Sequence, residues 1–111
     1  MTNTYLTIGS IWRLHHGDRE IARLTVTGTD MPWTYAAVEA LPGFEDFRRL
    51  FAEHEAALDG GDWEKAGDCF ARIRGELTMT FPDGGRVAEF LLRVYDDGTA
   101  GWRWFDEPFA P

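Results

Sequence analysis

Residues 44–73 of this 111-residue chain read FEDFRRLFAEHEAALDGGDWEKAGDCFARI, a pattern that predicts two consecutive helices. Apolar residues recur every three or four positions on both sides of the glycine pair at 60–61, as they do on the buried face of an amphipathic helix. The paired glycines favour the end of the first helix, and Asp62 is a suitable N-cap for the second. We therefore predict helices over residues 44–58 and 62–73.

The segments on either side of this helical region alternate apolar and polar residues with a period of two, which indicates β-strands. Gly17-Asp18 favours a tight hairpin between the first two strands, because glycine readily takes the positive φ of such turns. Residues 33–41 are ambiguous and fit either a short strand or a packed loop. The predicted strands cover residues 5–15, 20–28, 77–81, 86–95 and 102–105.

The order of elements is therefore two strands, two helices and three strands. Strands gathered around a helical block are typical of an α+β domain. We predict an antiparallel sheet of about five strands with both helices packed on one face. Partial closure of the sheet into a barrel fits the same order of elements. The length suits a single domain over residues 1–111, and no linker-like stretch divides it.

The net charge of −8 is concentrated in the helical region, where residues 39–68 contain nine acidic and three basic side chains. Nucleic-acid binding is disfavoured, because it requires a cationic surface that displaces counterions from phosphate. Anionic membranes are disfavoured for the same reason. An acidic helical surface could instead dock a basic partner.

Cysteine usage and hydropathy bear on the compartment. The single cysteine, Cys69, cannot form an internal disulfide, which is typical of a reducing environment. No apolar run approaches the roughly 18 residues of a membrane span, and the first residues lack the pattern of a signal peptide. We therefore expect a cytoplasmic protein without a membrane partner.

Arginines recur on one side of the predicted strands. If the period of two holds, Arg13, Arg23, Arg93 and Arg103 all point away from the helices, and Tyr95 accompanies them. Guanidinium groups bind carboxylates or phosphates bidentately and stack on aromatic rings. This face could therefore bind an anionic ligand or an acidic partner segment. The alternative is that acidic residues on neighbouring strands neutralise the arginines on a solvated face. The candidates for that role are Glu20, Glu76 and Glu89.

The irregular segment around Trp33 and Tyr35 is where we first expect a ligand, because loops on rigid scaffolds often carry binding residues. The chain has five tryptophans, which is many for its length. Four of them either line a pocket or, as the more ordinary interpretation, fill the layer between the helices and the sheet. These four are Trp33, Trp63, Trp102 and Trp104.

The sequence carries no recognisable catalytic or metal-binding motif. His15 and His16 would point to opposite faces of a strand, and His54 lies in an acidic stretch of the first helix that reads as solvent-facing. Metal sites usually show histidines or cysteines at fixed spacings, which do not occur here. Cys69 has an acidic neighbour, which does not favour a reactive thiolate. We therefore predict no catalytic residue, no metal and no cofactor.

These observations favour a non-catalytic binding or regulatory module whose open sheet face contacts another protein or, in a homodimer, a second copy of the chain. The alternative is a small enzyme or small-molecule carrier with an aromatic and arginine-lined pocket for an anionic ligand. No motif points to a known family. The residues that we expect to bind the ligand or partner are Arg13, Arg23, Arg93, Arg103, Tyr95, Trp33 and Tyr35.

Overall fold

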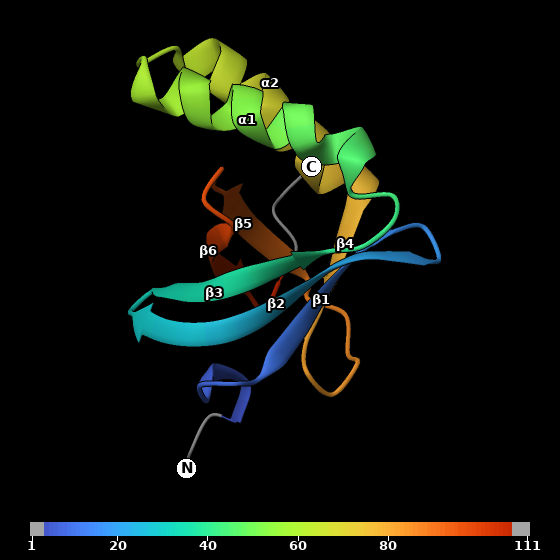
Figure 1. Cartoon of the computed structure of the whole chain (residues 1–111). Coiled ribbons are helices and arrows are strands. Elements are labelled where there is room, and N and C mark those ends of the chain that lie inside the picture. Colours follow the sequence, from blue (N-terminus) through green and yellow to red (C-terminus); the bar gives the residue numbers. More distant parts are fainter. Residues whose placement is uncertain (1–3, 108–111) are drawn as a thin grey trace.

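The computed structural model describes residues 4–107 and contains a six-stranded antiparallel sheet and two helices (Figure 1). The strands are ordered β4-β1-β2-β3-β6-β5 in the sheet, which is nearly closed into a barrel. The elements in chain order are the short 3-10 helix η1 (Thr4–Leu6), β1 (Ile11–His16), β2 (Arg19–Asp30), β3 (Trp33–Ala40), α1 (Glu45–Asp59), α2 (Trp63–Glu76), β4 (Leu77–Thr80), β5 (Glu89–Val94) and β6 (Thr99–Phe105).

The two edge strands of the sheet, β4 and β5, are tied together by the segment between them. The N–H of Val87 donates to the carbonyl of Met79 in β4 at 2.9 Å. Thr80 and Arg86 form an isolated antiparallel bridge beside it. An uncovered strand edge invites pairing with another chain. Here the chain itself occupies part of the edge of β4 just before it enters β5.

The barrel interior is filled by the apolar residues that alternate along the strands. Trp12 of β1 and Trp102 of β6 are both fully buried, and their ring centroids lie 5.2 Å apart. Trp12 also donates through Nε1 to the carbonyl of Tyr5 at 2.9 Å, and the Tyr5 ring stacks on Phe81. The η1 segment therefore packs against the core at the end of the barrel remote from the helices (Figure 1).

The helices α1 and α2 lie side by side across the other end of the barrel and contact it mainly through β5, with a smaller contact to β4 (Figure 1). The predicted N-cap of the second helix is confirmed, because the carboxylate of Asp62 accepts a hydrogen bond from the N–H of Lys65 at 3.1 Å. At its other end α2 runs directly into β4 without a loop. This connection and the β5 contact fix where the helical hairpin sits on the barrel.

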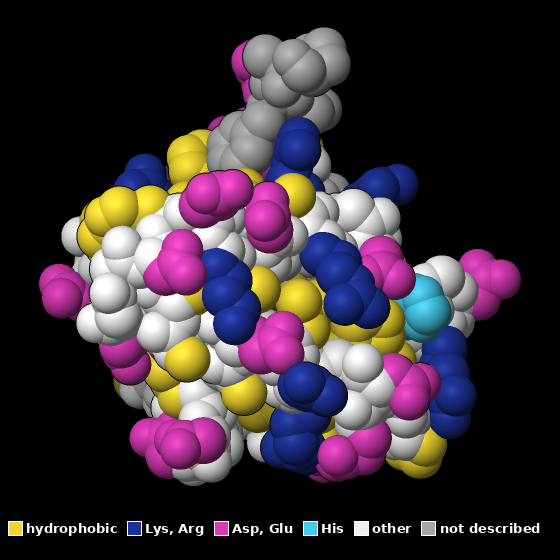
Figure 2. Space-filling view, turned by 90° about the horizontal axis from the view of Figure 1, so that it is seen from above, with side chains coloured by type: hydrophobic (Ala, Val, Ile, Leu, Met, Phe, Trp, Pro, Cys, Tyr) yellow, Lys and Arg dark blue, Asp and Glu magenta, His cyan; other side chains and the backbone are white. Residues whose placement is uncertain are grey.

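Charges on the helices are partly balanced within each helix. Arg48 pairs with Glu45 in α1, and Arg72 pairs with Glu76 in α2. Figure 2, which views the molecule from the helix side, accordingly shows acidic and basic side chains interspersed with small apolar areas. No helix in the described range is long and apolar enough to cross a membrane.

The predicted fold class is confirmed, since the chain is α+β with an antiparallel sheet and a partly closed barrel. The ambiguous segment forms strand β3, so the sheet has six strands instead of about five. The predicted first strand is too long, because η1 and Gly9, with a φ of +94°, precede β1. The strand predicted from residue 86 begins only at Glu89.

The prediction that four tryptophans fill the layer between helices and sheet is wrong for Trp63. This residue is the first of α2, and 70% of it is exposed. Trp102 is fully buried in the barrel and Trp104 packs against the same core. Trp33 is half-buried on the outside of the barrel.

Candidate functional site

Five of the seven predicted binding residues lie together on the outer face of β3, β6 and β5, with Tyr95 directly after the end of β5. They are Trp33, Tyr35, Arg93, Tyr95 and Arg103. The strand pairing places Gly101 of β6 opposite Tyr35 of β3 on one side and opposite Arg93 of β5 on the other. A Cβ atom at Gly101 would lie only 3.1 Å from the Tyr35 ring, and 3.5 Å from the hydroxyl of Tyr95. The missing side chain therefore allows both tyrosine side chains to approach the sheet here.

Trp33 and Arg103 continue this outer face by one step along their strands. Thr34 pairs with Trp102, and both of these residues point inward and are fully buried. Their neighbours Trp33 and Arg103 therefore share the outer face. Leu91 of β5 pairs directly with Arg103, which places Arg103 between Trp33 and Leu91 across the sheet.

Arg93 does not point away from the helices as the sequence suggested. It forms a bidentate ion pair with Glu55 of α1, with Nη2–Oε1 at 2.7 Å and Nε–Oε2 at 3.0 Å. Only 15% of the Glu55 side chain and 32% of the Arg93 side chain are exposed. The hydrogen bonds that Arg93 donates to Glu55 raise the pKa of the Arg93 guanidinium further above its ordinary value. Arg93 thus holds the helical hairpin against β5 and has its charge neutralised there.

A mostly apolar cavity of about 350 Å³ lies between this helical hairpin and β5. Two of its residues, Trp33 and Arg93, are among the predicted binding residues. The described lining is Trp33, His54, Leu58, Ala66, Gly67, Phe70, Leu91, Leu92 and Arg93.

His54 is the buried polar residue of this cavity. Its residue exposure is 6%, and its Nδ1 atom is buried without a hydrogen-bond partner, 4.0 Å from Oε2 of Glu55. Burial lowers the pKa of His54 and the nearby Arg93 lowers it further, while Glu55 acts in the opposite direction. His54 is therefore neutral at pH 7 and keeps unused hydrogen-bonding capacity.

The prediction that His54 faces solvent is wrong, and the sequence did contain the signal that would have corrected it. His54 follows Phe47 and Phe51 at intervals of seven and three residues, and these intervals return to the same face of a helix. Both phenylalanines are buried in α1. The prediction was based instead on the acidic residues at positions 53 and 55, which suggested a solvent-facing position.

A second, larger groove of about 590 Å³ lies between α1 and the end of β5. Glu55 lines this groove, and Arg93 lines the apolar cavity, so their ion pair forms the boundary between the two hollows. Tyr95 also lines the groove, and the Arg93 guanidinium carbon lies 5.4 Å from the centre of its ring. Burial raises the pKa of the Tyr95 hydroxyl.

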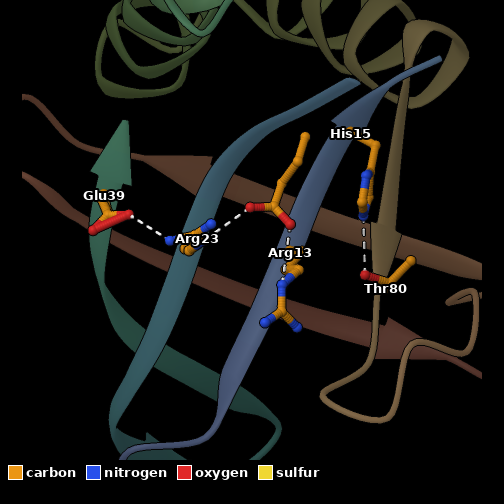
Figure 3. Close-up of polar contacts among 6 residues, drawn as sticks. Arg13, His15, Arg23, Glu39 and Thr80 are labelled. Atoms are coloured by element: carbon orange, nitrogen blue, oxygen red, sulfur yellow. Dashed lines mark hydrogen bonds and ion pairs between the residues drawn. The ribbon is translucent and has the colours of Figure 1, made fainter. Parts of the chain in front are cut away.

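Arg13 and Arg23 lie on a different part of the barrel surface, where they face each other across β1 and β2 (Figure 3). Glu20 bridges them, with one carboxylate oxygen 3.0 Å from Nε of Arg13 and the other 2.8 Å from Nε of Arg23. Glu39 of β3 adds a contact to Arg23 at 3.3 Å. On this face the structure agrees with the alternative interpretation, in which carboxylates neutralise the arginines on a solvated surface. Glu20 is the predicted acidic partner that does so.

The two other predicted acidic partners lie elsewhere. Glu76 pairs with Arg72 within α2. Glu89 is 5% exposed, and its carboxylate lies 2.8 Å from Nε of Arg74 in α2. Arg103 has no carboxylate within 4.0 Å among residues 4–107, so neither glutamate neutralises it. Its guanidinium lies 5.1 Å from the centre of the Phe105 ring, and its buried Nε–H has no hydrogen-bond partner.

The part of the chain that the structure describes contains no group of three or more His, Cys, Asp or Glu side chains placed to hold a metal ion. Cys69 is buried, and its desolvation raises the pKa of the thiol, so the reactive thiolate is disfavoured.

The fold and the cavity thus define the class: a small α+β barrel protein with a ligand-sized hollow under a helical hairpin. The chain matches no family model, no curated protein and no solved structure. Its function must therefore be argued from the site itself.

Proposed function

We propose that the protein is a non-catalytic module that binds a small, largely apolar molecule in the cavity between the helical hairpin and β5. The observation that carries this proposal is the combination of an apolar hollow of about 350 Å³ with a buried, unpartnered hydrogen-bonding atom on His54. Ligand sites in proteins are typically hollows of about 300–1,000 Å³ with apolar walls and a few polar groups. This cavity has that size and composition.

The energetics of the cavity support the same proposal. An apolar hollow forfeits the packing contacts that its walls could make, and a buried polar atom without a partner costs about 1–3 kcal/mol. A ligand with an apolar body would recover the packing contacts, and one hydrogen-bonding group would recover the second loss once the His54 ring turns Nδ1 towards it. Binding would also stabilise the folded state, by an amount that grows with the logarithm of the ligand concentration once this exceeds the dissociation constant.

The cavity chemistry favours binding over catalysis. Among its described lining residues, His54 is the one side chain that exchanges a proton near neutral pH, and its lowered pKa makes it a weak base. The lining supplies no serine, threonine or cysteine that His54 could activate as a nucleophile. The cavity can therefore hold and orient a molecule with the groups it has.

Binding can be tested with N-phenyl-1-naphthylamine, a neutral apolar fluorophore whose emission rises in an apolar environment. We expect saturable binding to the wild-type protein. The variant Gly67→Leu should weaken binding about tenfold or more, because Gly67 lines the cavity and a Cβ atom there meets nothing within 4 Å. An added leucine side chain has room to extend into the space that the probe needs.

Gly75→Leu provides the matched control. Gly75 lies on the same helix, a Cβ atom there also meets nothing within 4 Å, and it lines a hollow other than this cavity. Both substitutions replace a glycine of α2 with a better helix former, so both should favour the helix. Equal probe affinity in the two variants, or no saturable binding to the wild-type protein, would contradict the proposal.

A further inference from the structure

We propose that the ligand of this cavity is an apolar molecule with a single negative charge and that Arg103 binds that charge. This inference rests on the proposed function, because it assigns the class of ligand to the same cavity. It concerns a residue that lies beside the cavity on the outer face of β6.

Arg103 is placed at the cavity by the register of the sheet. It pairs with Leu91, and on its other side the outer position of β3 is Trp33. Leu91 and Trp33 both line the cavity. Outward side chains of paired residues on neighbouring strands lie about 5 Å apart at Cβ. Arg103 therefore leaves the sheet beside these two residues. Its guanidinium lies over the Phe105 ring, and a change of rotamer would bring it to a molecule held between Leu91 and Trp33.

Among the described basic residues around this cavity, Arg103 is the one whose charge is available. Arg93 lines the cavity, but the bidentate contact with Glu55 occupies it. Arg103 contacts the ring of Phe105, and no carboxylate of residues 4–107 lies within 4.0 Å of it. The proximity of an available cation thus distinguishes this cavity from a purely apolar one.

The buried Nε–H of Arg103 indicates what kind of group would be bound. This donor has lost contact with water and has no hydrogen-bond partner. An unmet buried donor is costly, and hydrogen bonds between a guanidinium and an anionic oxygen are about twice as strong as neutral ones. Protein atoms cover Nε in this conformation, so a carboxylate or sulfonate would first bind the terminal N–H groups. The same change of rotamer that brings Arg103 to the ligand would uncover Nε–H and complete the fork geometry typical of arginine.

A ligand with one negative charge suits this cavity better than a ligand with several. The protein carries a net charge of −8, which opposes the approach of a multiply charged anion. Glu55, which lines the neighbouring groove, lies on the far side of Arg93 from the cavity and adds negative charge nearby. A monovalent carboxylate or sulfonate on a hydrocarbon or aromatic body would place its charge on Arg103 and its body among Leu58, Phe70 and Leu91.

Two probes with the same ring skeleton test the charge preference. 1-Anilinonaphthalene-8-sulfonate carries one sulfonate that N-phenyl-1-naphthylamine lacks. We expect Arg103→Gln to weaken binding of the sulfonate probe about tenfold or more, since a hydrogen bond to a charged group contributes about this factor. Binding of the neutral probe should change less than about twofold. Arg103→Lys should recover part of the sulfonate affinity, because it keeps the charge and loses the fork.

Arg86→Gln is the control for net charge, because Arg86 is exposed and lines a different hollow. It should leave both affinities unchanged. If the neutral probe binds and Arg103→Gln leaves the affinity of the sulfonate probe unchanged, the charge assignment is overturned while the proposed cavity function stands. If Arg103→Gln unfolds at the wild-type temperature but loses both probes equally, Arg103 shapes the cavity instead of selecting charge, and the inference also fails.

Discussion

The outer face of β1 and β2 and the outer face of β5 and β6 carry similar arginine pairs with opposite surroundings. Arg13 and Arg23 are neutralised by carboxylates of their own sheet, and their side chains are 35% and 46% exposed. Arg93 is neutralised by a carboxylate of α1, 38 residues away in sequence, and its partner is nearly buried. Arg103 has no carboxylate partner in the described structure.

The contrast shows that strand alternation tells which residues point outward but not what lies outside. On β1 and β2 the outside is solvent, so the ion pairs there are screened and contribute little. On β5 the outside is the helical hairpin, so the same residue type becomes part of an interface with low exposure. A cavity exists on the second face because the hairpin covers it.

The largest effect is expected when the covered ion pair is broken. Arg93→Met should lower the free energy of unfolding by about 2 kcal/mol, because it leaves the nearly buried Glu55 without its partner. This value lies between the about 0–1 kcal/mol of exposed pairs and the about 3–5 kcal/mol of fully buried ones. Chemical denaturation at pH 7 measures it.

The double variant Arg93→Met, Glu55→Met separates the ion pair from simple packing. Removing both charges leaves no unpaired buried group, so we expect it to be more stable than Arg93→Met alone. A double variant no more stable than Arg93→Met would mean that the loss came from packing and not from the unpaired carboxylate.

A second, smaller effect concerns the pH dependence of stability through His54. Burial lowers the folded-state pKa of His54 below the unfolded value of 6.5. Above pH 6.5 both states are neutral. Below it the unfolded chain binds a proton that the folded protein resists, so the free energy of unfolding falls as the pH drops towards the folded-state pKa. The slope cannot exceed about 1.4 kcal/mol per pH unit for one proton.

Denaturation at several values between pH 7 and pH 5 tests this effect against His54→Leu, which should lack this contribution. Arg93→Met should also reduce it, because Arg93 helps to lower the pKa of His54 while the remaining Glu55 raises it. Parallel pH profiles for the wild type and His54→Leu would show that His54 is not held neutral by the fold.

Much of the fold could be predicted because its signals are local. Alternation in the strands identified the buried faces of β1, β2, β5 and β6, and helical spacing with an N-cap at Asp62 identified both helices. Strand β3 stayed ambiguous because its sequence alternates weakly, with Ala36 and Ala37 at its centre. It is a strand because β2 and β6 supply hydrogen bonds on both sides, a condition set by the tertiary fold.

The candidate site could be predicted only in part, since it is made by contacts between distant segments. Alternation placed Arg93 and Arg103 on the same side of the sheet, but it was wrong that Arg93 points away from the helices. The partner of Arg93 comes from α1, and no strand pattern reveals it. Gly101 was not recognised because a missing side chain gives no signal of its own. Its role follows from the register that sets it between Tyr35 and Arg93.

The smallest effect is expected on the solvated face. Arg13→Gln, Arg23→Gln should leave the midpoint of thermal unfolding nearly unchanged, because exposed ion pairs are screened by water and salt. Sedimentation velocity of the same variant tests whether this face mediates self-association. Unchanged sedimentation would identify the face as solvated surface. A loss of dimer would instead show that the Arg13–Glu20–Arg23 cluster belongs to an interface between copies, and the contrast between the two faces would then concern two binding surfaces.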